Sequence, residues 1–192
     1  MLREANKANR ETIFFILTKD GNFKRSSGDE NQKQEHYDQI GGALKSITSK
    51  TVNKDGKQFD TWHILLEDKT DNARYDISMS KLSVAFKGII RCLITEKAMA
   101  NLDDIVIEVY KSKDFINSKV YAGGEKLRWS EEPMPPAEKR VFNGQEQNDY
   151  TAQLEWLKNQ VQRINSKIEY DMSVMGPGED AEYVPETDDL PE

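Results

Sequence analysis

The spacing of apolar residues between positions 36 and 130 constrains the fold more than any other feature of the chain. Three segments with the residue types and alternation of strands precede one segment with the 3.6-residue period of an amphipathic helix, and two more strand-like segments follow. The predicted strands are residues 40–52, 57–67, 73–80, 104–111 and 115–122. The helical face between them consists of Leu82, Ala85, Phe86, Ile89, Ile90, Leu93 and Ile94.

This order is typical of the OB-fold, a five-stranded and partly open barrel. We therefore predict a mainly β protein whose residues 36–130 form a five-stranded OB-fold barrel, with a helix between strands 3 and 4. Gly41 and Gly42 predict a strong bend near the start of the first strand. Small mixed barrels and α+β sheets give similar patterns and stay open as alternatives.

Residues 1–35 are predicted to be an N-terminal extension that contains a strand or a small hairpin. The apolar run at residues 12–18 is followed by the turn signal Asp20-Gly21, which favours a short strand and a return. This strand could complete the barrel or be exchanged between subunits, and the sequence does not distinguish the two.

The residues after position 130 are predicted to form a linker, a helix and a tail. Pro133, Pro135 and Pro136 favour extended backbone in the linker, residues 131–147. Residues 148–172 have the spacing of an amphipathic helix, and residues 173–192 are predicted to be a disordered acidic tail. The helix is too short for a stable coiled coil alone, so its apolar stripe is expected to dock on the barrel, on a partner or on a second copy in a homo-oligomer. The stripe consists of Leu154, Leu157, Val161, Ile164 and Ile168.

The tail carries the whole net charge of the chain. The sequence has 27 Lys+Arg and 34 Asp+Glu, a formal net charge of −7. Residues 176–192 contain seven acids and no base, which leaves 27 residues of each sign in the rest of the chain. An anionic arm on a neutral body suggests a tail that covers a basic surface or recruits a partner, and a solubilising tail is the alternative.

Residues typical of enzymes and metal sites are sparse. His36 and His63 are the only histidines, and neither has a Cys or a second His at metal-ligand spacing. Phosphate-binding and dinucleotide-binding glycine motifs do not occur. We therefore predict no enzymatic activity, no cofactor and no metal. The single Cys92 and the lack of an apolar run long enough for a membrane span or a secretory signal favour a cytoplasmic protein without membrane contact.

Aromatic and cationic residues alternate on the predicted outer faces of the strands. Sequence-tolerant binding of single strands uses cations along the phosphates and aromatic rings on which bases stack. The predicted cations are Lys50, Lys54, Lys57, Lys111, Lys113 and Lys119, and the predicted stacking rings are Phe59, His63, Tyr110, Phe115 and Tyr121. Arg128 and Trp129 are a further pair at the domain edge, whereas Trp62 is predicted to lie in the core. Each ring taken singly is better explained by ordinary strand packing, and only its combination with the barrel order and the acidic tail favours stacking.

The chain resembles phage-type and bacterial single-stranded DNA-binding proteins in its layout and in its last residues. The shared plan is an OB-fold, a variable linker and an acidic tail, and the tail here ends Thr187-Asp188-Asp189-Leu190-Pro191-Glu192. The resemblance implies that Asp188, Asp189, Leu190 and Pro191 bind replication or recombination proteins. It also implies that the tail competes with DNA for the basic groove. The family ends in an aromatic residue, where this chain has Glu192.

Together these features predict a sequence-tolerant single-stranded DNA-binding protein that acts in DNA replication or recombination, of bacteriophage origin and located in the host cytoplasm. Two alternatives stay open. One is an OB-fold protein-interaction or structural module without DNA binding, and the other is an RNA-binding OB protein.

Overall fold

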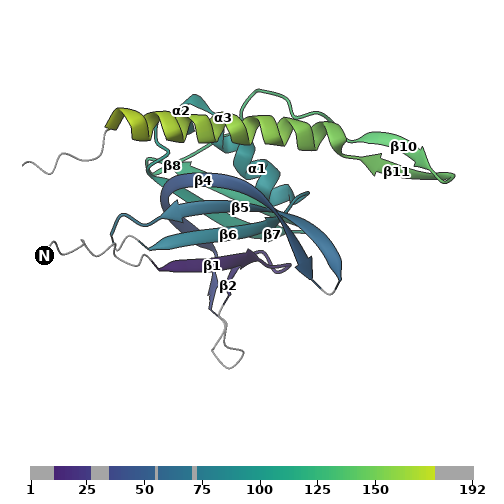
Figure 1. The fold of residues 1–192 in the computed structure, drawn as a ribbon, viewed down its shortest axis with the longest axis horizontal. Helices are drawn as coiled ribbons and strands as arrows, with labels where there is room; N and C mark the ends of the chain where they lie inside the picture. The colour runs from purple at the N-terminus through teal and green to yellow at the C-terminus, as the bar shows by residue number, and fades with distance from the viewer. Residues whose placement is uncertain (1–10, 27–34, 55, 71–72, 176–192) are drawn as a thin grey trace, which may run out of the picture.

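The computed structural model describes residues 11–26, 35–54, 56–70 and 73–175 (Figure 1). The strands are β1 (Thr12–Leu17), β2 (Phe23–Arg25), β3 (His36–Tyr37), β4 (Gln39–Lys54), β5 (Lys57–Glu67), β6 (Arg74–Ser80), β7 (Ile105–Ser112), β8 (Phe115–Ala122), β9 (Glu125–Lys126), β10 (Glu138–Phe142) and β11 (Gln145–Asp149). The helices are α1 (Val84–Leu93), α2 (Glu96–Met99) and α3 (Thr151–Met175). The fold is mainly β with a C-terminal helix, as predicted.

Strand β4 connects the two halves of the sheet because it bends at the predicted glycines. Residues Gln39 to Gly42 pair with β7, whereas Ala43 to Lys54 pair with β5. Gly42 has φ 153°, and a Cβ atom built there would lie 2.7 Å from the carbonyl oxygen of Glu67. Only glycine fits this close approach without displacing β5.

Within the described residues the sheet has nine strands in the order β3-β2-β1-β6-β5-β4-β7-β8-β9, in place of the five strands of the predicted barrel. The N-terminal extension supplies the extra strands: β1 pairs in parallel with the free edge of β6, and β2 and β3 continue from it. Strand β3 lies at one edge of the sheet and β4 in its interior. Because only Asp38 separates them in the chain, this edge of the sheet lies close to the start of β4.

Helix α1 lies between β6 and β7 in the chain and packs against β8, where its buried face forms much of the core. Ser83 caps the helix by accepting a hydrogen bond from the backbone N–H of Phe86. The ring of Phe86 stacks on Trp62 with 4.9 Å between centroids, so Trp62 is a core residue as predicted. Leu82, assigned to the helical face from the sequence, lies before the helix and is exposed.

Helix α3 runs along one side of the sheet (Figure 1) and docks on its own chain. Leu157, Val161, Ile164 and Ile168 are buried in the core, and Leu154 packs partly against it. The stripe that could have joined two copies is therefore covered by β4 and α1. Polar contacts fix the position of the helix: Asn165 accepts a hydrogen bond from the N–H of Ile47 (3.0 Å) and donates one to its carbonyl oxygen (2.8 Å).

The predicted linker contains a hairpin, β10–β11, which projects beyond one end of α3 (Figure 1). Its turn is Asn143-Gly144, with φ values of 51° and 76°. These positive angles are those of a two-residue type I′ turn. After Gly123 and Gly124 the chain folds back, and the short strand β9 pairs with the end of β8.

The structure bears only in part on two further predictions, the lack of a membrane span and the acidic tail. None of the helices in the described ranges combines the length and the apolar character that a membrane span requires. Helix α3 begins and ends three residues later than predicted, so residues 173–175 of the predicted tail are helical. Residues 176–192 lie outside the described residues, and so do residues 1–10 and 27–34 of the N-terminal extension.

Replacing Asn165 tests whether its side-chain amide satisfies the backbone N–H and carbonyl of Ile47 on the unpaired edge of β4. In Asn165→Ala the N–H and the carbonyl of Ile47 lose their partner, and we expect a loss of about 2 kcal/mol in the free energy of unfolding, measured by urea denaturation. Ser166→Ala, at the adjacent exposed position of α3, is the control. Equal stability of the two variants would contradict this role.

Candidate nucleic-acid interface

The outer side of β7 and β8 brings together three of the predicted rings and one of the predicted lysines. The antiparallel register pairs Glu108 with Lys119 and Tyr110 with Asn117, while Ile105, Ile107, Val109 and Val120 fill the buried side. Cross-strand partners point to the same side of a sheet. One surface, the β7–β8 face, therefore contains Glu108, Tyr110, Phe115, Lys119 and Tyr121. Tyr110 is 38% exposed and Phe115 is 58% exposed, so both rings are accessible.

A carboxylate in the middle of this face holds two of its functional groups. The ammonium of Lys119 donates to Glu108 at 2.5 Å, and the hydroxyl of Tyr121 donates to it at 2.9 Å. The hydrogen bond from Lys119, followed by that from Tyr121, lowers the pKa of Glu108, and the same carboxylate raises the pKa of Lys119 and of Tyr121. Lys119 also lies over the ring of Tyr110, 4.8 Å from its centroid.

Lys126 joins the β7–β8 face although the sequence analysis did not select it. Lys126 of β9 pairs with Tyr121 of β8, and its charge helps to lower the pKa of Glu108. Gly123-Gly124 followed by two polar residues is a hairpin signal that could have placed Lys126 beside Tyr121.

The β7–β8 turn adds one predicted cation, Lys113, at the edge of this face, whereas Lys111 of β7 pairs with Ile116 and lies on the opposite side of the strand pair. Lys111 and Lys113 are exposed, and Lys113 occupies the left-handed region with φ 55°. The N-terminal hairpin supports this end of β7, because a Cβ built on Gly21 would lie 2.5 Å from the backbone nitrogen of Lys111. The extension thus completes the sheet and contacts the strand that carries Tyr110.

The predicted residues of β4 and β5 lie on a different surface. Phe59 is half exposed and Lys57 is exposed, whereas the side chain of Lys54 is outside what the structure describes. Lys50 pairs with Asp76 at 3.4 Å. Within the described ranges, no hydrogen bond, ion pair or ring contact joins these residues to the β7–β8 face.

His63 does not provide the stacking surface that the strand alternation predicted. Its side chain is only 13% exposed, and its Nδ1 atom lies 2.7 Å from a carboxylate oxygen of Asp76 while Nε2 lies 3.1 Å from the hydroxyl of Thr61. Asp76 is buried and needs polar partners, which His63 and Lys50 supply. The His63 side chain therefore links β5 to β6 through Asp76 and is not available for base stacking.

Arg128 and Trp129 lie away from the β7–β8 face, beside α1. The indole ring of Trp129 is exposed and stacks on the guanidinium of Arg91, 4.1 Å from the ring centroid. The backbone of Ser130 anchors this segment by donating to the carbonyl of Arg91. Arg128 is exposed.

Two exposed apolar residues of β1, Phe14 and Ile16, were missed because residues 12–18 form an unbroken apolar run. Their pairing partners are Asp76 and Ser78 of β6, so they lie on the outer side of the sheet with His63. Alternation within the run, with Phe15 buried, is the signal that could have separated its two sides.

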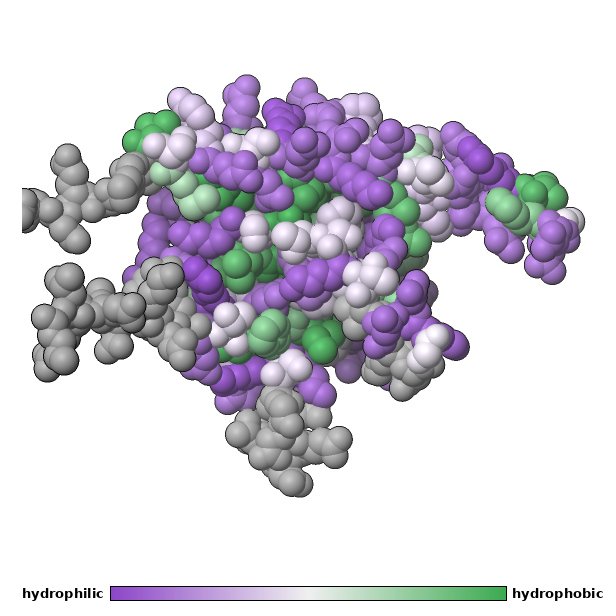
Figure 2. Space-filling model, viewed as in Figure 1, coloured by the Kyte–Doolittle hydropathy of each residue, from purple (hydrophilic) through white to green (hydrophobic). Residues whose placement is uncertain are grey.

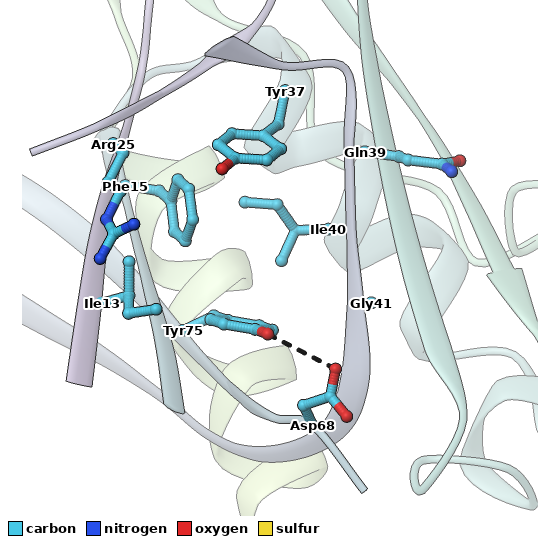
Figure 3. Close-up of a pocket in the computed structure, with 9 residues that line it drawn as sticks. All are labelled: Ile13, Phe15, Arg25, Tyr37, Gln39, Ile40, Gly41, Asp68 and Tyr75. Carbon is cyan, nitrogen blue, oxygen red and sulfur yellow. Dashed lines mark hydrogen bonds between the residues drawn. The ribbon is translucent and has the colours of Figure 1, made fainter. Parts of the chain in front are cut away.

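A pocket of about 280 Å³ opens where β3 leads into β4 (Figure 3). Phe15, Tyr37 and Tyr75 face it, and the ring of Phe15 meets the other two edge-on at 5.5 Å and 5.9 Å. Its single cation, Arg25, pairs with Glu11 and Glu35, and Asp68 accepts a hydrogen bond from Tyr75. Three carboxylates around one guanidinium disfavour a phosphate here.

Comparison with known proteins does not add to this description. No protein-family model, no curated protein and no solved structure matches the chain. The assignment of the interface therefore rests on the geometry and charge described above.

The lowered pKa of Glu108 predicts how the β7–β8 face contributes to stability. A carboxyl group with a folded pKa below its ordinary value of 4.5 stabilises the protein above that value, and the contribution is lost as the pH falls through the folded pKa. The urea midpoint of Glu108→Gln should therefore lie below that of the wild type at neutral pH, and the difference should shrink as the pH falls below 4.5. Asn117→Ala, on the same face but without a titrating group, should show a difference that is independent of pH.

Proposed function

We propose that the protein binds single-stranded DNA in a sequence-tolerant manner through the β7–β8 face. The observation that carries this proposal is the presence of accessible rings, Tyr110 and Phe115, on the same side of one strand pair as Lys119 and Lys126. Bases stack on such rings whatever their identity, and neighbouring ammonium groups neutralise the phosphates.

Glu108 sets the strength of this interaction in the proposed mechanism. It occupies Lys119 in the free protein, so an incoming phosphate must compete with the carboxylate for the ammonium. A contact of this kind is weaker than one to a free lysine, which suits a protein that must release its strand. Lys113 of the β7–β8 turn extends the cationic path beyond Phe115.

We further propose that β4, β5, β6, β7 and β8 correspond to the five strands of an OB-fold. The pairings β4–β5, β5–β6, β4–β7 and β7–β8 and the position of α1 between β6 and β7 support this correspondence. In this proposal β1 takes the place beside β6 where the barrel would otherwise close.

The acidic tail is proposed to compete with DNA for the cations and, once displaced, to bind replication or recombination proteins. Support comes from charge alone: the tail holds the entire excess of seven acids, and the proposed interface is cationic at its edges. The resemblance of the last six residues to those of phage-type and bacterial single-stranded DNA-binding proteins points the same way and favours a bacteriophage origin.

A protein-interaction module is the second candidate function. Burial of the α3 stripe removes the binding element first considered for it. The exposed tip of the β10–β11 hairpin, Val141 and Phe142, is the observation that favours it instead.

Titration of a labelled poly-dT oligomer, followed by fluorescence anisotropy, tests the proposed interface. Tyr110→Ala and Phe115→Ala should each weaken binding roughly 5- to 150-fold, because each stacked base contributes about 1–3 kcal/mol. Tyr170→Ala, an exposed ring on α3, should bind like the wild type. Absence of binding by the wild type at low salt would exclude the function, and binding of RNA in preference to DNA would favour the RNA-binding alternative.

Lys113→Gly separates DNA binding from stability. Glycine relieves roughly 1–2 kcal/mol of left-handed strain and returns part of it as unfolded-state entropy, so the urea midpoint should not fall. The affinity for poly-dT should fall, and the slope of log affinity against log salt should decrease by about 0.7. Asn143→Gly is the matched control, because it relieves the other described positive φ of a non-glycine residue without removing a cation. Unchanged DNA binding by Lys113→Gly would remove this residue from the interface.

Removing residues 176–192 tests the competing tail. The shortened protein should bind poly-dT more tightly than the full chain at low salt, and the difference should vanish at high salt because it is electrostatic. A full-length variant with the same tail residues in scrambled order should bind like the wild type. Equal affinity of the full and shortened proteins at low salt would refute the competition.

A further inference from the structure

Among the described residues, the β10–β11 hairpin is an exposed element that packs against no other element. Its residues from Glu138 to Asn148 are all exposed, and its tip carries Val141 at 71% and Phe142 at 60% exposure. Figure 2 shows hydrophobic atoms gathered at this tip, beyond the hydrophilic surface of α3. A two-stranded hairpin is marginally stable in water when nothing packs against it, so a partner that covers the tip would stabilise it.

An apolar groove of about 290 Å³ lies at the other end of α3. Its floor is formed by Leu44, Leu102 and Ile168, and its rim by Ala100 of the α2 C-cap and by the half-exposed Met172. The groove has room for one or two side chains of the size found at the hairpin tip, and a drug-sized ligand would exceed it.

The charges around the two surfaces are already paired within the chain. At the groove, Lys45 pairs with Glu67, Asp103 with Lys69, and Lys167 with Asp171. On the hairpin, Lys139 pairs with Glu146, and Arg140 with Glu138 and Asp149. Contact between the two surfaces would bury apolar area without leaving an unpaired charge, whereas the balanced charges of the hairpin give no attraction for phosphate.

The hairpin of a chain does not reach its own groove. Between Thr151 and Ile168, α3 spans about 25 Å at 1.5 Å per residue, and the hairpin extends away from this span (Figure 1). Tip and groove therefore lie at opposite ends of one axis. Surfaces placed in this way join copies head to tail and produce an open row.

We propose that Val141 and Phe142 of one copy insert into the Ala100–Met172 groove of the next copy, so that copies bound to one strand form a row. The contact is small, so copies should associate weakly in free solution at high protein concentration and more strongly on DNA, where the local concentration of neighbouring copies is high. The formation of a row on DNA rests on the proposed function, whereas the contact between copies does not require DNA.

The test uses two full-length variants, Val141→Ser/Phe142→Ser at the tip and Met172→Glu at the groove, both at exposed positions. Sedimentation velocity at increasing concentration, without DNA, should show self-association of the wild type and of neither variant alone. A 1:1 mixture should form a dimer and no larger species, because one intact groove meets one intact tip. Gln145→Ser, an exposed substitution in the same hairpin, should associate like the wild type.

The second readout is cooperativity on DNA. On long poly-dT each variant should lose about tenfold or more of the wild-type cooperativity, while its affinity for an oligomer of single-site length stays unchanged. Association of either variant like the wild type, or failure of the mixture to form a dimer, would overturn the contact. If the mixture forms the dimer and no protein binds poly-dT, the proposed function fails and the contact stands.

Discussion

The rest of the structure depends on the bend of β4 at Gly41 and Gly42. A straight strand could pair with β5 or with β7 along its length, but the bend lets its two parts pair with both. The free edge left on the second part is then sealed by Asn165, whose amide supplies the donor and acceptor of a missing strand. Strand β4 therefore positions the sheet, helix α3 and the β7–β8 face. Its bend requires Gly42, because a Cβ atom at this position would clash with the backbone of Glu67.

Charge on the outer surface is balanced locally by pairs of residues. Lys119 pairs with Glu108, Lys50 with Asp76, Lys81 with Asp60 and Lys45 with Glu67. Ion pairs between exposed side chains add little to stability, but pairs of either kind decide which cations a polyanion can recruit without competition. Lys113 and Lys126 are exposed, have no ion pair within the described ranges and border the β7–β8 face, whereas the β4–β5 surface has one such cation among the predicted residues described there, Lys57. This distribution favours that face over the β4–β5 surface as the place where a single strand binds.

The strands were predictable because alternation and β-rich composition determine them locally: 57–67 and 115–122 match β5 and β8 at both ends. The side of each strand was predictable for Trp62, Tyr110 and Phe115 for the same reason. Pairing partners depend on contacts distant in sequence, so neither the parallel β1–β6 pair nor the burial of Asp76 that engages His63 could be inferred from local pattern. The β10–β11 hairpin was missed for a different reason. Its Asn143-Gly144 signal is strong, but the prolines before it suggested a linker.

Binding of a single strand on the β7–β8 face is tested most directly by photochemical cross-linking of the full-length protein to an oligomer of 5-iodouridine, with the attached residues identified by mass spectrometry. If the strand lies on this face, the oligomer should attach to Tyr110, Phe115 or Tyr121, and the attachment should be lost at high salt. Attachment confined to Phe14, Phe59 or Trp129, with the β7–β8 face unmodified, would contradict it.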